Sequence, residues 1–318
     1  MKTINGLMKH LRDRHNIQIQ GSHQKKILTN FGYYHCYKGY RFYKDSSDTI
    51  PYKTFNELTV VYNYDTQLKA LLYEKIMYIE TALKNMALIT ILEQAGSEEF
   101  STIFDTILDN YKKYQKKEER DKAIRKKLEL RDMIYKTITE MYSVKVINHF
   151  YFRDRNVPIW AIFEIISLGQ FGSILLSMNQ ATRIKLSKLV GLASNLDPNG
   201  SILTDMVFAI KPLRNAIAHN NVLFDTRFKD SEISKKLSTY LYITLGIRVD
   251  FSNLTDYIIL VAYLLKLIGY KQRSILTFLK EYLLICNMLK EEISEDPYKK
   301  VIRSEPKEKI DLLIKKLK

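Results

Sequence analysis

The segment from Thr54 to Gly96 constrains the fold more than any other part of the chain. Thr54 and Glu57 have the spacing of a capping box, which predicts the start of a short helix. Asp65 can cap a second, long helix that Gly96 ends. The apolar residues of that second helix recur at intervals of three and four, as on one helical face: Leu68, Leu71, Leu72, Ile76, Ile79, Leu83, Met86 and Ile89.

Other segments show the same helical character. Residues 157–178, "VPIWAIFEIISLGQFGSILLSM", begin with Pro158 near a first helical position, carry Trp160 and are apolar almost all round. They predict a helix central to the core. Residues 201–220 form another helical stretch, in which Pro212 either kinks the helix or marks its start. The remaining expected elements are a loop at about 225–232 and helices at about 254–269 and 273–292.

Glycine and proline are scarce, with eleven and six in 318 residues, and this favours an all-α chain because helical proteins need few turns. We expect one helical domain with additions at both ends. The expected division is an N-terminal basic and aromatic extension packed on the core (1–53), a helical domain (54–292) and a charged C-terminal tail (293–318).

The net charge of +15 favours nucleic acid or an anionic surface as a partner. A lysine-rich proteome from an AT-rich genome would produce the same excess, so charge alone decides nothing. Cys36 and Cys286 suggest no disulfide framework. The N-terminus lacks the apolar core of a signal peptide, and the longest apolar run, 257–270, is too short to span a bilayer and contains Lys266. We therefore expect a cytoplasmic location without a membrane partner.

Two segments are candidates for RNA binding. In "NFGYYHCYKGYRFYK" (30–44), aromatic residues alternate with cations, which suits base stacking beside phosphate contacts. The alternative is that these tyrosines brace the N-terminal segment against the core. In "YKKYQKKEERDKAIRKK" (111–127), a run of lysines could bind phosphates or form an ordinary solvated helix face. The RNA-binding candidates are Tyr33, Tyr34, Lys38, Arg41, Lys112, Lys113, Lys116 and Lys117.

Familiar catalytic motifs are missing from the sequence. The six histidines have no HxxxH or HxH spacing, and no CxxC, GxSxG or phosphate-binding glycine loop occurs. We expect no metal site and no cofactor. The remaining candidates lie in "KPLRNAIAHNNVLFD" (211–225), where Asn215 and His219 are four residues apart and share a helix face. Arg214 has a side chain long enough to reach the same place.

Arginine and histidine together can cleave an RNA phosphodiester. Arg214 offers a fixed positive fork for phosphate, and a histidine such as His219 can exchange protons near neutral pH. RNA supplies its own nucleophile, the 2′-OH, so the protein need only move protons and stabilise charge at phosphorus. The alternative is a structural helix end, at which the histidine caps carbonyls and the arginine pairs with a carboxylate such as Asp205 or Asp225.

The stretch "PLRNAIAHNNVLFD" closely resembles the RNxxAHN motif of HEPN ribonucleases, in the version found in Abi-type abortive-infection (bacteriophage resistance) proteins. Three further blocks similar to those of the family precede it in order. They are an aromatic segment, "FGYYHCYKGYRFY", then a long helix, "YNYDTQLKALLYEKIMYIETALKN", and then a PxWxxxExxxxG helix at Pro158, Trp160, Glu164 and Gly169. The resemblance covers about residues 30 to 225.

This resemblance implies a HEPN-like helical bundle and, as in many HEPN proteins, metal-independent endoribonuclease activity. By motif position, His219 is implied as the general acid/base and Arg214 as the clamp on the phosphate and transition state. Asn215 would orient the pair, with Asn220 as a supporting candidate. Glu164 is a second supporting candidate, and a buried structural hydrogen-bonding role is the alternative for it.

A dimer follows from the chemistry as well as from the resemblance. Attack by a 2′-OH benefits from two proton-transfer groups, and the chain has one such motif. We expect a homodimer or higher even oligomer with a composite active site. RNA is the expected substrate, and a small regulatory RNA is a conceivable antitoxin. The alternatives are a non-catalytic RNA-binding or scaffold protein, and a HEPN-type partner in a toxin–antitoxin complex that a protein neutralises.

Overall fold

The protein is described by a computed structural model that covers residues 3–304 and 306–317. About 71% of it is helical, and the described residues contain no strand, only three isolated β-bridges. This confirms the predicted all-α class. The helices are α1 (Ile4–His15), α2 (Gly21–Tyr33), α3 (Phe55–Ala95), α4 (Phe100–Thr106), α5 (Lys117–Glu140), α6 (Lys145–Tyr151), α7 (Ile159–Ile165), α8 (Leu168–Ser177), α9 (Gln180–Val190), α10 (Ile202–Ala218), α11 (Lys235–Leu245), α12 (Leu254–Leu267), α13 (Gln272–Glu292), α14 (Glu295–Ile302) and α15 (Pro306–Leu317).

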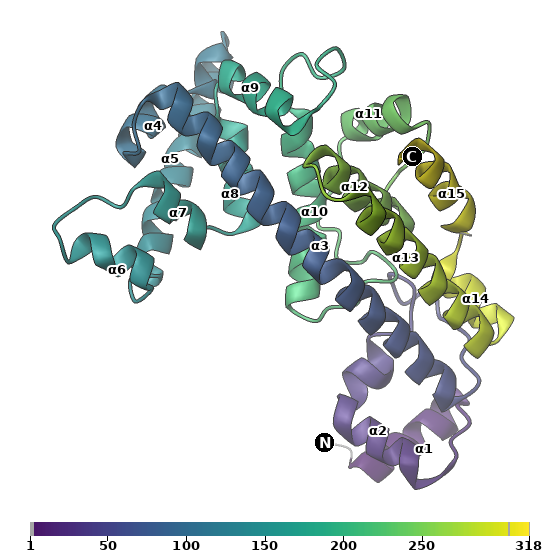
Figure 1. Cartoon of the computed structure of the whole chain (residues 1–318). Helices are drawn as coiled ribbons and strands as arrows, with labels where there is room; N and C mark the ends of the chain where they lie inside the picture. The colour runs from purple at the N-terminus through teal and green to yellow at the C-terminus, as the bar shows by residue number, and fades with distance from the viewer. Residues whose placement is uncertain (1–2, 305, 318) are drawn as a thin grey trace.

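Helix α3 is the central element, and Figure 1 shows it running from the N-terminal helices at one end of the molecule to α4 and α9 at the other. Its 41 residues span about 60 Å. The predicted capping box is confirmed, since the Thr54 hydroxyl accepts from the Glu57 amide and the Glu57 carboxylate accepts from the Thr54 amide, both at 3.2 Å. Gly96 ends the helix with φ of 61°.

The predicted break before Asp65 is wrong, because the helix is continuous through this residue. Asp65 does not cap a helix; its buried carboxylate accepts hydrogen bonds from a distant loop. The apolar stripe is correct from Leu68 to Leu83, which are both fully buried. It fails at Ile89, which is 52% exposed, because near its end α3 buries a different face, with Ala87 and Ile91.

The segment 157–178 is two helices, α7 and α8, and the prediction of one helix is wrong. A capping box starts α8. In it, the Ser167 side chain accepts from the Gln170 amide at 3.2 Å, and the Gln170 side chain accepts from the Ser167 amide at 2.7 Å. Trp160 does not lie in the core, since 37% of its surface is exposed. Helix α8 packs closely on α10, where Gly172 leaves room for the Phe208 ring.

Helix α10 carries the Arg-Asn…His motif in its last turn. It begins at Ile202 and contains Pro212, so the proline does not mark the start of this helix. Its neighbours are α3, α8, α11 and α12. One face of α10 is therefore buried deeply, including Met206, Ile210 and Leu213 at 0% exposure.

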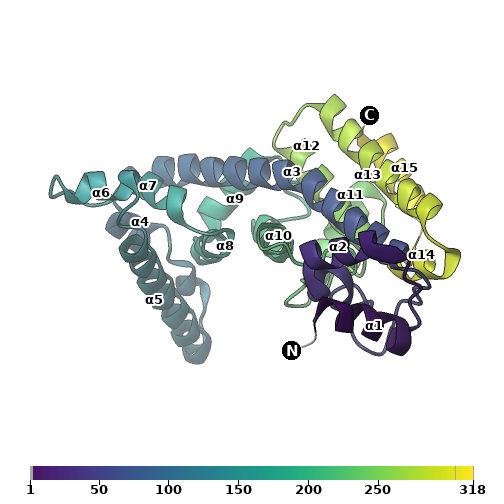
Figure 2. The ribbon, with the colours of Figure 1, turned by 90° about the horizontal axis from the view of Figure 1, so that it is seen from below.

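The segment after the motif is more structured than the sequence predicts. Helix α11 was not expected, whereas α12 and α13 match the expected ranges within three residues. In the segment expected as a charged tail, the described residues form α14 and α15. Ile310 and Leu313 of α15 are fully buried against α12 and α13. Figure 2 shows α5 projecting away from the rest of the molecule. The 3₁₀ turn Asn110–Lys113, α5 and the residues between them are together called the arm below.

Candidate functional site

The last turn of α10 presents the motif at the surface. Asn215 and His219 are both exposed, and the His219 amide donates to the Asn215 carbonyl at 3.0 Å, so the two residues are neighbours along one helical turn. Asn220 follows with φ of 53°, the left-handed conformation that asparagine tolerates at a helix end. The polar end of α10 therefore faces solvent, while its apolar residues hold the helix in the core.

Arg214 is fixed by a carboxylate of α3. Its Nε lies 3.0 Å from Oε2 of Glu80, and Oε1 of Glu80 lies 2.9 Å from Nζ of Lys84. Lys84 also donates to the Ile166 carbonyl at 2.7 Å, at the end of α7. An arginine paired with a carboxylate was one expectation, but the partner is Glu80 and neither Asp205 nor Asp225.

The guanidinium of Arg214 keeps donors for a ligand. No hydrogen bond of its terminal nitrogens occurs within the described residues, and 27% of its side chain is exposed. Arg214 opens on a cleft of about 220 Å³, which Glu80, Lys84, Asn85 and Glu164 also line. The structure thus brings two predicted residues, Arg214 and Glu164, to one cleft.

Glu164 is exposed, so its predicted alternative as a buried hydrogen-bonding residue is wrong. Neither His219 nor Asn215 lines the cleft around Arg214. Asn215 directly follows Arg214 on α10, and His219, the residue that caps this helix, lies about 1.4 helical turns beyond Arg214. A single chain therefore offers a cleft lined by an arginine and, near it along the chain, an exposed histidine.

A buried carboxylate on α3 holds the chain that follows the motif. Asp65 is fully buried, and its Oδ1 accepts from the amides of Leu223 and Phe224, both at 2.8 Å. Its Oδ2 accepts from the Tyr40 hydroxyl at 2.9 Å and lies 2.9 Å from Nζ of Lys69. Burial raises the pKa of Asp65, although Lys69 and the two amides oppose that shift. Asp65 therefore ties the N-terminal segment, α3 and the loop after α10 together.

Lys69 extends this network to the motif itself. Its ammonium group is buried beside Asp65 and donates to Oδ1 of Asn220 at 2.8 Å. Asn220 is the residue directly after His219, so a contact from α3 fixes the backbone where the helix ends. This gives Asn220 a positioning role that its sequence position alone did not indicate.

A second clip joins the N-terminal segment to the same loop. Asp225 is fully buried, accepts from the Lys44 amide at 2.7 Å and accepts from Nε of Arg227 at 2.7 Å. Arg227 in turn donates to the Phe42 carbonyl at 2.7 Å. The segment 40–44 is therefore hydrogen-bonded to two residues of the loop at 223–227.

The aromatic segment is largely structural. Tyr37, Tyr40 and Tyr43 are buried, as expected if tyrosines brace the N-terminal segment against the core. Burial raises the pKa of Tyr40, and the nearby Asp65 carboxylate adds to the shift. Gly32, with φ of 72°, allows the turn between α2 and a π-helical turn at Tyr34–Lys38.

The residues predicted to bind RNA in this segment lie closer to the surface. Tyr34 is 55% exposed and Lys38 is exposed, whereas Tyr33 is partly buried. Arg41 is partly buried, and its guanidinium carbon lies 4.8 Å from the centre of the Phe42 ring. RNA binding by these residues stays a prediction.

The four lysines of the arm that are predicted to bind RNA differ in their contacts. Lys112 pairs with Asp109 at 2.7 Å, and Nζ of Lys113 lies 4.8 Å from the centre of the Tyr114 ring. Lys116 and Lys117 are exposed at the start of α5. None of these lysines lines the cleft around Arg214, so they form a separate surface.

Sequence reasoning missed the α3 residues that support the site. Asp65, Lys69, Glu80 and Lys84 fall within about 100° of one another around the helix axis. Two carboxylate–lysine pairs with four-residue spacing along one side of the helix are the signal that would have found them. Such a polar stripe needs partners when it is buried, and the end of α10 provides some of them.

The described residues hold neither a candidate metal cluster nor a candidate membrane span. Over residues 3–304 and 306–317, no three His, Cys, Asp or Glu side chains lie close enough together to hold a metal ion. In the same residues, no helix combines the length and apolar character needed to cross a membrane.

The site lies within a segment that matches a known family. A family model described as Abi-like protein matches residues 26–225, a span that begins in α2 and ends at Asp225. It includes Asp65, Glu80 and the whole Arg-Asn…His motif. No curated protein and no solved structure matches the chain. Since the matched span is more than half of the 318 residues, the chain belongs to the family of Abi-like proteins.

Proposed function

We propose that this chain is a HEPN-type endoribonuclease that acts as an antiphage toxin in abortive infection. Membership of the Abi-like family supports the setting, which is abortive infection as a defence against bacteriophages. The observation that carries the activity is the arrangement at the end of α10. Arg214 is fixed through Nε by Glu80 with its terminal nitrogens available, and the exposed His219 lies on the same helix end.

The reaction follows from these groups. The 2′-oxygen of a ribose attacks the adjacent phosphorus and gives its proton to a neutral imidazole. The bond from phosphorus to the 5′-oxygen breaks, and that oxygen takes a proton from an imidazolium. The products are a 2′,3′-cyclic phosphate and a 5′-hydroxyl end. Arg214 stabilises the negative charge on the phosphoryl oxygens, and Asn215 orients the pair.

One histidine in each chain leaves one proton transfer unassigned. In our proposal a second copy provides it, so that two copies of His219 and Arg214 form one composite site in a homodimer or higher even oligomer. Glu164, exposed at the Arg214 cleft, is the supporting carboxylate in the same chain.

Substitution of His219 tests the activity. We expect His219→Ala to slow cleavage of a labelled RNA by about 100-fold or more, because one general acid/base contributes about that factor, while RNA affinity is unchanged. The matched control is His23→Ala, another exposed histidine, which should cleave normally. Mass spectrometry of the products, formed with chelator present, should detect 2′,3′-cyclic phosphate ends.

The same assay on the wild-type protein distinguishes the nuclease from a rival function. A non-catalytic RNA-binding scaffold is favoured by the Arg214–Glu80 pair, which would also serve as a purely structural contact. In that case the wild-type protein binds RNA but gives no cleavage. Cleavage and growth arrest that persist in His219→Ala would remove the nuclease assignment from this site.

A toxin of this kind needs restraint in uninfected cells. With a net charge of +15, the chain suits a small RNA as its antitoxin, and a protein antitoxin is the alternative. Sequencing of nucleic acid that co-purifies with His219→Ala from its host should yield one dominant small RNA. A preparation free of RNA, or one with unselected RNA, contradicts an RNA antitoxin.

A further inference from the structure

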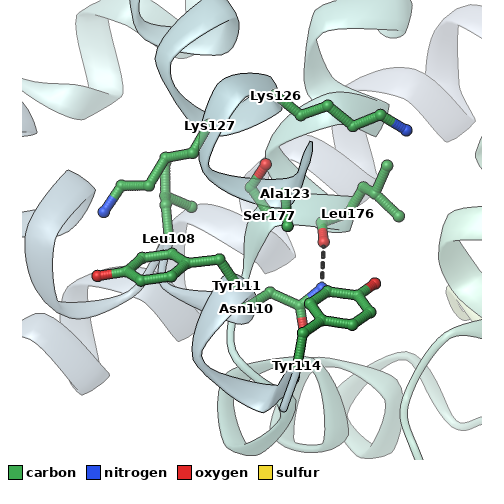
Figure 3. Close-up of a pocket in the computed structure, with 9 residues that line it drawn as sticks. All are labelled: Leu108, Asn110, Tyr111, Tyr114, Ala123, Lys126, Lys127, Leu176 and Ser177. Carbon is green, nitrogen blue, oxygen red and sulfur yellow. Dashed lines mark hydrogen bonds between the residues drawn. The ribbon is translucent and has the colours of Figure 1, made fainter. Parts of the chain in front are cut away.

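The arm carries a pocket that shares no lining residue with the cleft around Arg214. It has a volume of about 110 Å³ and lies where the 3₁₀ turn Asn110–Lys113 meets α5 and the end of α8. Figure 3 shows the rings of Tyr111 and Tyr114 along one side and the side chains of Lys126 and Lys127 along the other.

The two tyrosine rings offer flat surfaces beside positive charge. Both are partly exposed, so a planar ring can reach them from solvent. Nζ of Lys113 lies 4.8 Å from the centre of the Tyr114 ring, and the guanidinium carbon of Arg120 lies 5.8 Å from that of Tyr111. Aromatic faces flanked by cations are the arrangement that holds bases and phosphates of single-stranded nucleic acid.

Asn110 places an unused acceptor in this pocket. Its Nδ2 donates to the Leu176 carbonyl at 2.9 Å, and that partner fixes the orientation of the amide because a carbonyl can only accept. Oδ1 is buried and has no hydrogen-bond partner within the described residues. A buried acceptor without a donor is costly, so a ligand with an N–H group is favoured here. Each of the four RNA bases carries such a donor on its Watson–Crick edge.

Lys127 adds a buried cation without a carboxylate partner. Only 8% of its surface is exposed, and within the described residues it makes no hydrogen bond and no ion pair. Its Nζ lies 4.2 Å from the centre of the Phe104 ring and 5.1 Å from that of Tyr111. Burial lowers the pKa of Lys127, although the charges of two nearby aspartates oppose that shift. An anion at the pocket would stabilise its charge, and the exposed Lys126 beside it would strengthen that attraction.

We propose that this pocket binds one nucleotide of a single-stranded RNA. The base lies against Tyr111 and Tyr114 and donates to Asn110, its phosphate lies at Lys127, and the neighbouring phosphate of the strand lies at Lys126, whose side chain points the other way (Figure 3). The choice of RNA rests on the function proposed above, whereas the binding of a base and a phosphate rests on the pocket. A free mononucleotide presents the same chemistry, so the test separates the two sources.

Fluorescence anisotropy with a labelled RNA 12-mer provides the test, using full-length His219→Ala protein so that the RNA stays intact. We expect Tyr114→Ala to raise the Kd roughly 5- to 100-fold, the equivalent of about 1–3 kcal/mol for one stacked base. Tyr114→Phe keeps the ring and should bind normally. Tyr73→Ala, which removes an exposed tyrosine of α3, is the control and should also bind normally.

A second variant avoids any effect on folding. Lys126→Ala removes an exposed side chain and should lower the slope of log Kd against log salt by about one phosphate contact. Lys136→Ala, on the same helix but outside the pocket, should leave the slope unchanged. Wild-type affinity and slope in both Tyr114→Ala and Lys126→Ala would overturn the assignment.

Competition identifies the source of the nucleotide. Mononucleotides should displace the RNA only at concentrations far above the Kd of the 12-mer, because they lack the neighbouring contacts. A mononucleotide that binds more tightly than the 12-mer, and loses that affinity in Tyr114→Ala, would overturn the choice of RNA. The readout is binding alone, so loss of the nuclease proposal leaves this result standing, and the reverse also holds.

Discussion

Asp65 shows how one side chain can organise a site that it does not enter. Four groups from three parts of the sequence surround its carboxylate, and none of them is near it in the sequence except Lys69. Without the Asp65 carboxylate, the buried ammonium of Lys69 would lose its counter-charge. The loop at Leu223 and Phe224 would lose the acceptor for two amides.

We therefore expect Asp65→Ala to lower the free energy of unfolding by about 3–5 kcal/mol, the usual cost of breaking a buried ion pair from one side. Urea denaturation followed by circular dichroism measures this. The control is Asp132→Ala on α5, whose side chain is 73% exposed and which should change stability by less than about 0.5 kcal/mol. Equal stability of the two variants would show that Asp65 is dispensable.

At the residue scale, the sequence indicates the motif but not its partners. Arg214, Asn215 and His219 could be selected from local spacing and from resemblance. Glu80 could not be paired with Arg214, because it lies 134 residues earlier and its four-residue spacing to Lys84 says nothing about which distant residue it contacts. Long-range pairing is decided by packing, which a pattern along the chain does not encode.

Among the elements, helix starts were more predictable than helix continuity. The capping box at Thr54 was identified correctly, but the similar one at Ser167 was overlooked inside an apolar run. Asp65 resembles a helix cap because aspartate is common at helix starts. Its carboxylate instead accepts hydrogen bonds from a distant loop. Apolar composition alone does not distinguish one long helix from two short ones.

The start of α10 depends on a close approach of two segments. Asp197 accepts from the amides of Ser201 and Ile202 at 2.9 and 3.1 Å. Gly200, with φ of 62°, lies so close to α9 that an added Cβ would be 2.5 Å from the carbonyl carbon of Arg183. These contacts set where the helix that carries the motif begins.

Gly200→Ala should consequently lower the free energy of unfolding by about 3 kcal/mol, from the left-handed conformation plus the overlap with α9. Gly269→Ala is a matched control, because Gly269 also has a positive φ, of 74°, but no atom within 4 Å of the added Cβ. Its cost should be about 1 kcal/mol, from the backbone alone. Thermal unfolding of both variants measures the difference. Equal losses of stability would mean that α9 moves aside without a loss of free energy.

On the scale of the whole molecule, the all-α class follows from few turns and strong helical periodicity, and the structure agrees. The expected division into an extension, a helical domain and a tail stays a prediction. Its last part is nonetheless helical, because Ile310, Leu313 and Leu317 form an apolar face among the charges of α15 and pack inward. The high charge of this last part predicts an exposed tail when only its composition is considered, and not the apolar face.

The proposed composite site makes a prediction about mixed dimers. Wild-type and His219→Ala chains with different tags are co-expressed, and the mixed dimer is isolated through both tags in turn. We expect it to have less than about one tenth of wild-type activity, because one shared site then lacks a proton-transfer group. Half of the wild-type activity would mean that each chain holds a complete site, and recovery of no mixed species would mean a monomer.

The reach of Asp65 across the sequence also sets an order of events during synthesis of the protein. The two amides that bind its carboxylate belong to Leu223 and Phe224, 158 and 159 residues later. A growing chain that has completed α3 therefore lacks the donors that hold the end of α10, whatever helix it has already formed. The end of α10, with Arg214 and His219, therefore becomes ordered late in translation, when most of the polypeptide has left the ribosome.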